Sequence, residues 1–592
     1  MHRPHPGSGT SLQGGPRNRA AGAFGDEDGK KGWIDVFIPR QSCFAGRVLP
    51  CVIYEDEHLL AVNKPAGWNT HAPAPFAGEG IYDWLRHREP RWATLALIHR
   101  LDKETSGALL FARTALANRS LTDQFTRRAV RKRYLLFTDR SAREPRFVVR
   151  SCLVRSGAKY LGRPLHAGGE LAETKFRVLD RAEAVQWLTQ AGLSRTGLSV
   201  LEAVPLTGRT HQIRVQAADR GLPILGDTLY GGSPAPRVCL HAAGLGLIHP
   251  ASGQPLELTA PLPRLEQPRL ELRQAILEPD LTDAYRLVHG ASDGWAGWSV
   301  DRLGDYLLSE AEEPPTPAQR QYLERLCQSV GARGVYHKLL SRQVRHTPAA
   351  AASPQRVLGE AAPARFAVRE NGLQFELSFN EGYSVGLFLD QRDNRRRLLT
   401  GHVGAGFPLA PARGRDARPL EVLNTFAYTC AFSVCAARAG ARVTSLDLSR
   451  KYLEWGRRNF ALNGLEADAH DFIFGDVFDW LRRLARKGRR FDVILLDPPT
   501  FSQSKQSGVF RAERDYGKLV GLALPLLQPQ GVLFASSNAA GWPPEDFQET
   551  IRSALSDAGA VARQSLYVPQ PADFPISRAE PAHLKTLWLR LG

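Results

Sequence analysis

Two stretches of the sequence gather residue types that could do chemistry. The segment LIHRLDKETSGALLFAR (97–113) sets a single carboxylate, Asp102, among basic and polar side chains. An isolated H-R-L-D could form a salt-bridged turn, but a carboxylate in such a setting can also serve as a nucleophile or a base. Far along the chain, Asp447, Asp476 and Asp497 each follow an apolar run. These two groups of residues are the candidate sites.

Further motifs accompany Asp102 in the first half of the chain. They are NKPAGW (63–68), RKRYLLF (131–137), PLTGRTHQIRVQAADRGLPILGDTLYGG (205–232) and LHAAGLGLIHP (240–250). With these motifs, residues 50–265 resemble the pseudouridine synthases of the RluA type. The two signatures that carry the resemblance are H-R-L-D-x-x-T-S-G and G-R-T-H-Q-I-R.

The resemblance implies a role for four residues of this chain. Asp102 would be the unprotonated carboxylate that acts next to the ribose carbon. Arg214 would pair with Asp102 and hold it ionised. Tyr134 would pack on the target base, and Arg100 would enter the RNA as the uridine flips out of its stack.

The last part of the chain alternates apolar strands with helices. Five strand–helix units, starting with VLNTF (422–426), predict a parallel doubly wound sheet. Ligands of such sheets bind at the carboxyl ends of the strands. Each of the three aspartates could simply cap a helix, but their positions at successive strand ends favour a binding site.

Motifs around these strands add a second resemblance. They are TDAYRLVHGASDGWAGWSVDRLGD (282–305), GLFLDQRDNRR (386–396), LNTFAYTCAFSV (423–434) and LDPPTFSQSK (496–505). Residues 275–592 thereby resemble the class I ribosomal-RNA methyltransferases of the RlmI and RlmK type, which implies S-adenosylmethionine as the cofactor. The cofactor loop of that family reads F-x-Y-T-G-x-F, and Cys430 replaces its glycine here.

This second resemblance also implies site residues. Asp447 would bind ribose hydroxyls, Asp476 would lie near an adenine amino group, and Asp497 would serve both cofactor binding and catalysis at the mouth of the sheet. The remaining cofactor residues would be Phe426, Tyr428 and Thr429. On the RNA side, Arg392 and Arg395 would lie beside the cleft and Phe501 would stack on the base.

The sequence favours a nitrogen as the methyl acceptor. Methylation of cytosine carbon 5 needs a cysteine thiolate that adds to carbon 6, and the stretch after the fifth strand, LFASSNAAGW (533–542), contains none. We therefore expect a purine nitrogen such as guanine N7. Two alternatives stay open: a cytosine-C5 enzyme fused to the synthase, and an RNA-binding ribosome-assembly protein with one inactive half.

Composition and Gly- or Pro-rich boundary segments divide the chain into four parts. We expect a disordered tail over 1–32, an α+β synthase domain with a mixed antiparallel sheet over 33–270, a small α+β middle domain that presents RNA over 271–375, and an α/β Rossmann-like methyltransferase domain over 376–592. The segment DVFIP (35–39) reads as a strand, and 346–364 reads as a flexible loop.

Charge and cysteine content indicate the partner and the compartment. The formal net charge of +17, with basic runs at 127–133 and 482–490, favours RNA, by resemblance 23S rRNA or a pre-ribosomal particle. Seven cysteines without a C-x-x-C pair argue against a disulfide scaffold and a metal site, and fit the cytoplasm. The sequence indicates no signal peptide, membrane span or obligate protein partner.

Overall fold

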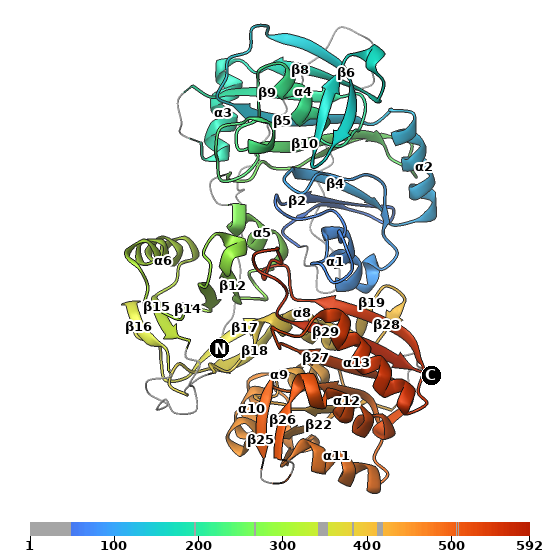
Figure 1. The fold of residues 1–592 in the computed structure, drawn as a ribbon, viewed down its shortest axis with the longest axis vertical. Coiled ribbons are helices and arrows are strands. Elements are labelled where there is room, and N and C mark those ends of the chain that lie inside the picture. The colour runs from blue at the N-terminus through green and yellow to red at the C-terminus, as the bar shows by residue number, and fades with distance from the viewer. Residues whose placement is uncertain are drawn as a thin grey trace, which may run out of the picture.

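Three large sheets with their helices, together with three two-stranded hairpins, make up the described part of the chain (Figure 1). The computed structural model describes residues 49–193, 197–265, 268–340, 353–381, 384–410, 418–504, 506 and 508–592. The expected tail over 1–32 and the expected strand over 35–39 lie outside these ranges. Within these ranges, no helix is both long and apolar enough to cross a membrane.

The first sheet is mixed and mostly antiparallel, as expected. Only β4 and β10 run parallel among its neighbouring strands. Its order is β1 (Val52–Glu55), β2 (Leu59–Lys64), β4 (Ser106–Ala112), β10 (Leu240–Ile248), β5 (Arg131–Thr138), β9 (Ser199–Pro205), β8 (Glu170–Val178), β6 (Arg146–Ser156) and β7 (Lys159–Arg163), with β3 (Ala96–Leu97) on β4 and β11 (Pro255–Thr259) on β10. Every residue of the apolar strand β4 is buried, which places β4 at the centre of this part of the molecule.

Four helices accompany this sheet: α1 (Ile81–Arg88), α2 (Ala115–Thr126), α3 (Arg181–Ala191) and α4 (Gln212–Asp219). Local sequence fixes where they begin. The Thr114 hydroxyl accepts a hydrogen bond from the Ala117 backbone and caps α2. Asp180 and Glu183 form a reciprocal capping box at the start of α3.

The second sheet follows the order β12 (Ala284–His289), β13 (Ser299–Leu303), β14 (Tyr306–Ala311), β15 (Gly334–Leu339) and β16 (Gln355–Gly359), with helices α5 (Pro268–Ile276) and α6 (Pro317–Val330). Strand β16 corrects the expectation of a loop over 346–364. Residues 341–352 lie outside the described ranges, but Gln355–Gly359 pair with β15. A segment of plain composition becomes a strand here because it completes the edge of a sheet, a context that local pattern does not reveal.

The third sheet has the order β23 (Asp471–Phe474), β22 (Arg442–Asp447), β21 (Glu421–Thr425), β24 (Phe491–Leu496), β27 (Leu527–Ser537), β29 (Lys585–Leu591) and β28 (Ala562–Pro569). The first five strands are parallel and β29 is antiparallel to β27. The connecting helices are α9 (Ala431–Arg438), α10 (Arg450–Leu462), α11 (Val477–Arg486), α12 (Ala512–Ala523) and α13 (Pro544–Asp557). The expected doubly wound sheet is confirmed, and its strand order reverses between β21 and β24, where ligands bind in such folds.

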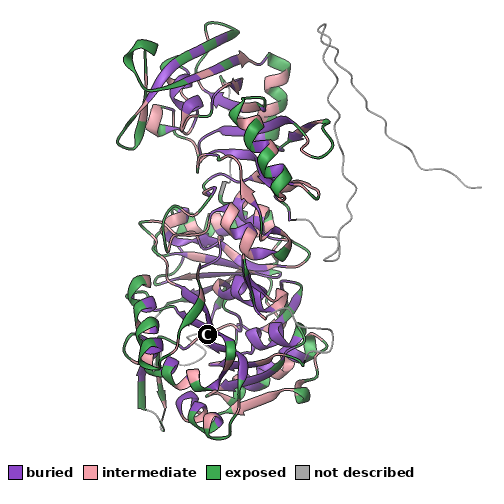
Figure 2. Ribbon diagram, turned by 90° about the vertical axis from the view of Figure 1, so that its right-hand side faces the viewer, coloured by how far each residue is buried: buried purple, intermediate pink, exposed green. Residues whose placement is uncertain are grey.

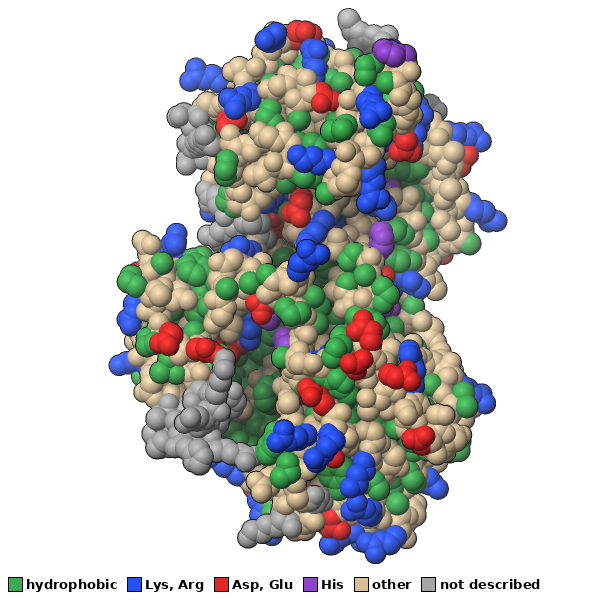
Figure 3. All heavy atoms as spheres, viewed as in Figure 1, with side chains coloured by type: hydrophobic (Ala, Val, Ile, Leu, Met, Phe, Trp, Pro, Cys, Tyr) green, Lys and Arg blue, Asp and Glu red, His purple; other side chains and the backbone are tan. Residues whose placement is uncertain are grey.

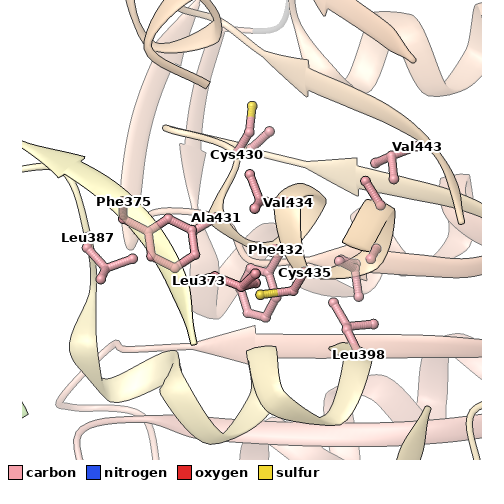
Figure 4. Packing of buried hydrophobic residues seen from close by; sticks show 14 of the residues in the cluster. Leu373, Phe375, Leu387, Leu398, Cys430, Ala431, Phe432, Val434, Cys435 and Val443 are labelled. Carbon is pink, nitrogen blue, oxygen red and sulfur yellow. The ribbon is translucent and has the colours of Figure 1, made fainter. Parts of the chain in front are cut away.

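A hairpin of β17 (Phe366–Glu370) and β18 (Leu373–Leu377) joins the core of the third sheet. Leu373 and Phe375 lie against residues of α9 in one buried cluster, which also includes Leu398 of α8 (Arg392–Thr400) (Figure 4). The domain limit expected at residue 375 therefore falls inside β18. We propose that the limit lies before β17.

The synthase part and the middle sheet share a core. Trp84 and Trp92 belong to the same buried cluster as Trp298 and Leu307 of the second sheet. Buried residues concentrate on the central strands of the sheets, while the outer helices and hairpins carry the exposed positions (Figure 2). Two further hairpins, β19 (His402–Gly404) with β20 (Phe407–Pro408) and β25 (Phe501–Ser504) with β26 (Gly508–Arg511), extend from the third sheet.

Candidate active sites

The first cavity, of about 850 Å³, opens around Asp102 in the loop between β3 and β4. The Asp102 side chain is 25% exposed, and its neighbour Arg100 is exposed at the cavity wall. The loop is held by Thr70, whose hydroxyl bonds both the backbone nitrogen and the carbonyl of Leu101. Asp102 therefore faces the cavity from a braced loop.

Arg214 reaches this cavity from α4. Its Nε and Nη2 donate to the two carboxylate oxygens of Asp227 at 2.6 and 2.8 Å. Its Nη1 lies 4.0 Å from the Asp102 carboxylate. The structure thus brings Arg214 and Asp102 together, but the bidentate pair that fixes Arg214 is with Asp227. Sequence reasoning missed Asp227, although it stands in the quoted motif G-D-T-L-Y.

Two aromatic groups and a histidine complete the surroundings of Asp102. Tyr134 is half-buried on β5, outside the residues that line the cavity, and burial together with the Asp102 charge raises the pKa of its phenol. His211 lines the cavity, and its Nδ1 lies 2.8 Å from the Tyr230 hydroxyl. Burial lowers the pKa of His211, which favours a neutral ring there. His211 was missed because its motif was represented by Arg214 alone.

The second cavity, of about 600 Å³, lies at the carboxyl ends of β21, β22 and β24. Asp447, Asp476 and Asp497 all line it, as do Phe426 and Tyr428. The three aspartates that the sequence scattered over 51 positions therefore share one cavity. Carboxylates and aromatic rings in this arrangement suit a nucleoside with a charged substituent.

The loop from β21 to α9 holds three non-glycine residues, Phe426, Tyr428 and Cys430, at φ values of 55°, 48° and 61°. Such left-handed backbone is the reason that a glycine is useful here. The chain keeps Cys430 instead, and α10 makes room for it: a Cβ on Gly456 would come within 2.4 Å of the Cys430 Sγ. Because the Cys430 side chain is fully buried in the core, it leaves the cavity open.

Asp447 and Asp476 are fixed by backbone hydrogen bonds. Asp447 accepts from the nitrogens of Tyr428 and Ser449, both at 2.8 Å. Burial raises the pKa of the Asp447 carboxyl, and these hydrogen bonds oppose the shift. Asp476 caps α11 by accepting from Asp479 and also accepts from the Ser504 hydroxyl at 2.5 Å. Asp476 therefore both caps α11 and lines the cavity.

The Asp497 carboxylate is hydrogen-bonded by a neutral side chain. The Gln391 amide nitrogen lies 3.2 Å from the Asp497 carboxylate and 2.8 Å from the Ser536 hydroxyl. Burial raises the pKa of Asp497 to about 6, and the charge of Asp390 acts in the same direction. Asp390 itself pairs with His583 at 3.1 Å. Gln391 and Asp390 line the cavity and were missed, because only the arginines of the motif L-D-Q-R-D-N-R-R were selected.

The structure corrects the expected RNA contacts Arg392 and Arg395. Both residues are buried, at 3% and 2% exposure. Arg392 forms a bidentate pair with Asp573, and Arg395 forms one with Glu370. Because both guanidinium groups are enclosed in these ion pairs, neither is available to a phosphate.

Two further expectations are corrected. Thr429 is buried and does not line the cavity, since its hydroxyl donates to the Gly386 carbonyl at 2.7 Å. Phe501 is 38% exposed on β25 and also lies outside the cavity lining, whereas Ser502 and Ser504 belong to it. Side chains of a strand alternate between its two faces, so Phe501 faces away from the cavity.

The cysteines near the second cavity are packing residues. Cys430 and Cys435 are buried, and burial raises the pKa of the Cys430 thiol to about 12. Neither belongs to the cavity lining, which contains no cysteine among the described residues. The interpretation of both as packing residues is confirmed.

Comparison with known proteins finds relatives of both halves of the chain. Residues 58–219 match a family model described as RNA pseudouridylate synthase, and residues 285–590 match one described as S-adenosylmethionine-dependent methyltransferase. A ribosomal RNA large subunit methyltransferase of Deinococcus radiodurans is 35% identical over 318 residues, which are 52% of this chain and 73% of the relative.

Two other proteins are similar to parts of this chain. Ribosomal RNA large subunit methyltransferase I of Klebsiella pneumoniae (strain 342) is 33% identical over 313 residues, covering 53% of this chain and 74% of the relative. The solved structure of human RNA pseudouridylate synthase domain containing 4 has 26% identity and a TM-score of 0.29, and the match covers 38% of this chain and 92% of that one. Both resemblances noted in the sequence are confirmed: the chain joins an RNA pseudouridylate synthase domain to an S-adenosylmethionine-dependent methyltransferase, and it belongs to that methyltransferase family.

Proposed function

We propose that this chain makes two modifications in large-subunit ribosomal RNA: it isomerises a uridine to pseudouridine and methylates a base at a purine nitrogen. The observation that carries the proposal is the pair of separate cavities, one built around Asp102 and one around Asp447 and Asp497. The names of the methyltransferase relatives, which are ribosomal RNA large subunit methyltransferases, support the ribosomal substrate. A cytoplasmic location follows from that substrate.

In the synthase cavity, Asp102 supplies the carboxylate that acts at the sugar of the target uridine. Arg214 stays in place through Asp227 and offers its remaining nitrogen to Asp102. Arg100 is exposed at the cavity wall, where it can occupy the space left in the RNA when the base is extruded. Tyr134 on β5 is close enough to Asp102 for that charge to help raise the pKa of its phenol, and we assign it the role of packing on the target base.

The second cavity fits S-adenosylmethionine. Asp447 keeps lone pairs beyond its two backbone bonds and would hold ribose hydroxyls, and Asp476 would meet the adenine amino group. Phe426 and Tyr428 supply aromatic walls. When bound, this cofactor supplies a methyl group on a positively charged sulfonium. The residues of the chain orient the acceptor base against it and exclude water.

The lining of this cavity favours a nitrogen acceptor. A nitrogen lone pair attacks a methyl directly, whereas carbon 5 of cytosine needs a thiolate, and no cysteine is among the described residues that line the cavity. The Thr500 hydroxyl donates to the Asn538 side-chain oxygen at 2.9 Å, which leaves the Asn538 amide hydrogens as donors to an acceptor edge such as that of guanine.

The surface supports a polyanionic partner. Lys and Arg side chains are spread over both halves, and they gather where α11 and α12 lie at the bottom of the view (Figure 3). Part of the basic run 482–490 is structural, since Arg483 pairs with Asp479 and Arg489 with Asp471. Other cations of α11, such as Arg482 at the rim of the second cavity, are placed to meet phosphates.

Nucleotide-resolution mapping of rRNA from cells with and without the protein tests the proposal. We expect the loss of one pseudouridine and one methylated purine. Loss of 5-methylcytidine instead would overturn the choice of acceptor in favour of the cytosine-C5 alternative. Calorimetry with S-adenosylmethionine separates the enzyme from an RNA-binding assembly protein, because an inactive methyltransferase half would give no heat at high protein concentration.

A further inference from the structure

A second hollow of the synthase domain lies where β5 and β9 separate. The two strands pair from Thr138–Ser199 to Tyr134–Ala203. Beyond Tyr134, β5 stays on β10 while the chain after β9 turns away towards α4. A cavity of about 490 Å³ occupies this fork, lined by residues 125, 126, 128–132 and 204–209. We call it the fork cavity.

The fork cavity is lined by cations without carboxylates. Its charged lining residues are Arg128, Arg131, Lys132 and Arg209. Two of them pair with acids outside the lining, Arg131 with Glu257 and Arg209 with Glu170, both at 3.0 Å. Arg128 is exposed and sits at a φ of 58°. The hollow therefore carries a positive charge that its own walls do not neutralise.

Lys132 is the cation of this lining that is partly buried and has no carboxylate partner among the described residues. Its ammonium lies 5.3 Å from the centroid of the Phe125 ring, and within the described ranges no carboxylate pairs with it. Burial lowers the pKa of Lys132, because its charged ammonium group has lost part of its contact with water. His99 stacks on the same Phe125 ring and stays neutral, because burial and the Lys132 charge lower its pKa to about 3.

The opposite wall is preformed and approaches closely. The Thr207 hydroxyl donates to the Gln212 side-chain oxygen at 2.6 Å, and the same oxygen accepts from the Arg209 backbone at 3.0 Å. A Cβ on Gly208 would lie 3.3 Å from the Lys132 Nζ, so a glycine lets the backbone come near this ammonium. The wall continues directly into Thr210 and His211, which line the Asp102 cavity.

We propose that the fork cavity binds a backbone phosphate of the RNA strand whose neighbouring nucleotide enters the Asp102 cavity. A phosphodiester supplies the negative charge that Lys132 and Arg128 lack, and contacts of this kind position a strand without reading its sequence. The proposal rests on the proposed function, in that the synthase substrate is RNA. It adds a contact that fixes the register of the strand beside the reacting uridine.

Substitution of Lys132 tests the proposal. Lys132→Gln should raise the KM for pseudouridine formation on an rRNA transcript about tenfold, change kcat by less than about threefold, and reduce the salt slope of RNA binding by about one. Lys132→Arg keeps the charge and should restore KM and slope. Arg119→Gln on α2 is the matched control, because Arg119 is exposed and lies outside the cavity lining.

Arg128→Gln gives a second variant at the exposed rim, where folding is not at stake, and it should shift KM and the salt slope in the same direction. Unchanged KM and slope in both variants would overturn the proposal. ³¹P NMR with inorganic phosphate shows whether the cavity binds a free anion instead of RNA. If the wild type broadens the phosphate signal, Lys132→Gln abolishes this broadening, and RNA binding is the same in both proteins, the proposal is also overturned. If the wild type formed no pseudouridine, the proposed function would fall, while the salt slope would still decide the phosphate contact.

Discussion

The linings of the two candidate cavities of this chain carry opposite net charge. The cavity around Asp102 is lined by four Lys and Arg residues and three carboxylates, whereas the cavity around Asp497 is lined by five aspartates and only two such cations. The first suits a phosphate-bearing strand, and the second suits a cofactor whose reacting group is cationic. The same division appears in how the central carboxylates are held, with Asp102 beside Arg214 and Asp497 beside neutral Gln391.

The cavities also differ in how they connect to the rest of the molecule. The Asp102 loop is partly exposed, while Asp390 and Gln391, directly before α8, line the second cavity. Helix α8 packs against α9 and lies next to α1 of the synthase domain. Arg396 of α8 pairs with Glu89 next to α1, and Arg88 of α1 pairs with Glu278. Two chemistries that need no common residue are thus built into one continuous structure.

The largest expected effect separates the two activities. Asp102→Asn should lower pseudouridine formation by at least about 10³-fold, because the amide is neither a nucleophile nor a base. Methylation of the same transcript should stay within about twofold. Both rates are measured on one protein preparation, and a parallel loss of methylation without unfolding would contradict the independence of the cavities.

The next effect concerns the buried ion pairs. Arg395→Leu leaves Glu370 without its bidentate partner in the core and should destabilise the chain by about 3–5 kcal/mol. Thermal unfolding measures the loss. The double variant Arg395→Leu with Glu370→Leu should recover much of it, because no charge is then left buried and unpaired. A stable Arg395→Leu protein with weakened RNA binding would restore the RNA-contact interpretation.

A smaller effect is expected at the cofactor side. Asp447→Ala should weaken S-adenosylmethionine binding by about 10- to 100-fold, since a charge-assisted hydrogen bond to the ribose is lost. Titration calorimetry measures it, and pseudouridine formation should be unaffected. Phe501→Ala is the matched control, because this ring faces away from the cavity, and its cofactor affinity should equal that of the wild type.

The raised pKa of Asp497 predicts a pH dependence of stability. Its folded pKa of about 6 exceeds the ordinary 3.8, so the native state takes up a proton first and stability rises as pH falls from above 6 towards 4. Asp497→Asn removes the ionisation and should stabilise the chain by about 1–3 kcal/mol at pH 8, with the difference vanishing near pH 4. Thermal unfolding of both proteins across this range checks the sign. An equal difference at pH 8 and pH 4 would contradict it.

Much of this architecture follows from local sequence. The strand–helix alternation of the last part and the aspartates at its strand ends could be predicted, because parallel buried strands are continuously apolar and their ends converge. The motif around Asp102 likewise indicated the synthase cavity. The sequence pattern could not show which way a side chain points. Arg392, Arg395 and Phe501 lie next to cavity-lining residues in the sequence. In the structure the two arginines are buried in the core, and Phe501 lies on the face of its strand that points away from the cavity.

The partners that were missed share a physical reason. Asp227, Gln391 and His211 each contact another side chain of a site. These contacts depend on distances between atoms in the folded protein, which the spacing of residues in the sequence does not give. The edge strand β16 was missed in the same way, because only its neighbour β15 makes it a strand. The sequence predicted candidate reacting groups, and the structure shows which side chains hold them in place.

The smallest effect tests how the cofactor loop tolerates Cys430. Gly456→Ala should destabilise the chain, because its Cβ would meet the Cys430 Sγ at 2.4 Å. Cys430→Gly relieves the left-handed backbone but empties the space above Gly456, so its net effect should be small. The double variant fills that space with the new methyl group and should be more stable than the sum of the single changes by about 1 kcal/mol. Thermal unfolding of the four proteins gives this coupling, and strictly additive changes would show that Gly456 does not compensate for the missing loop glycine.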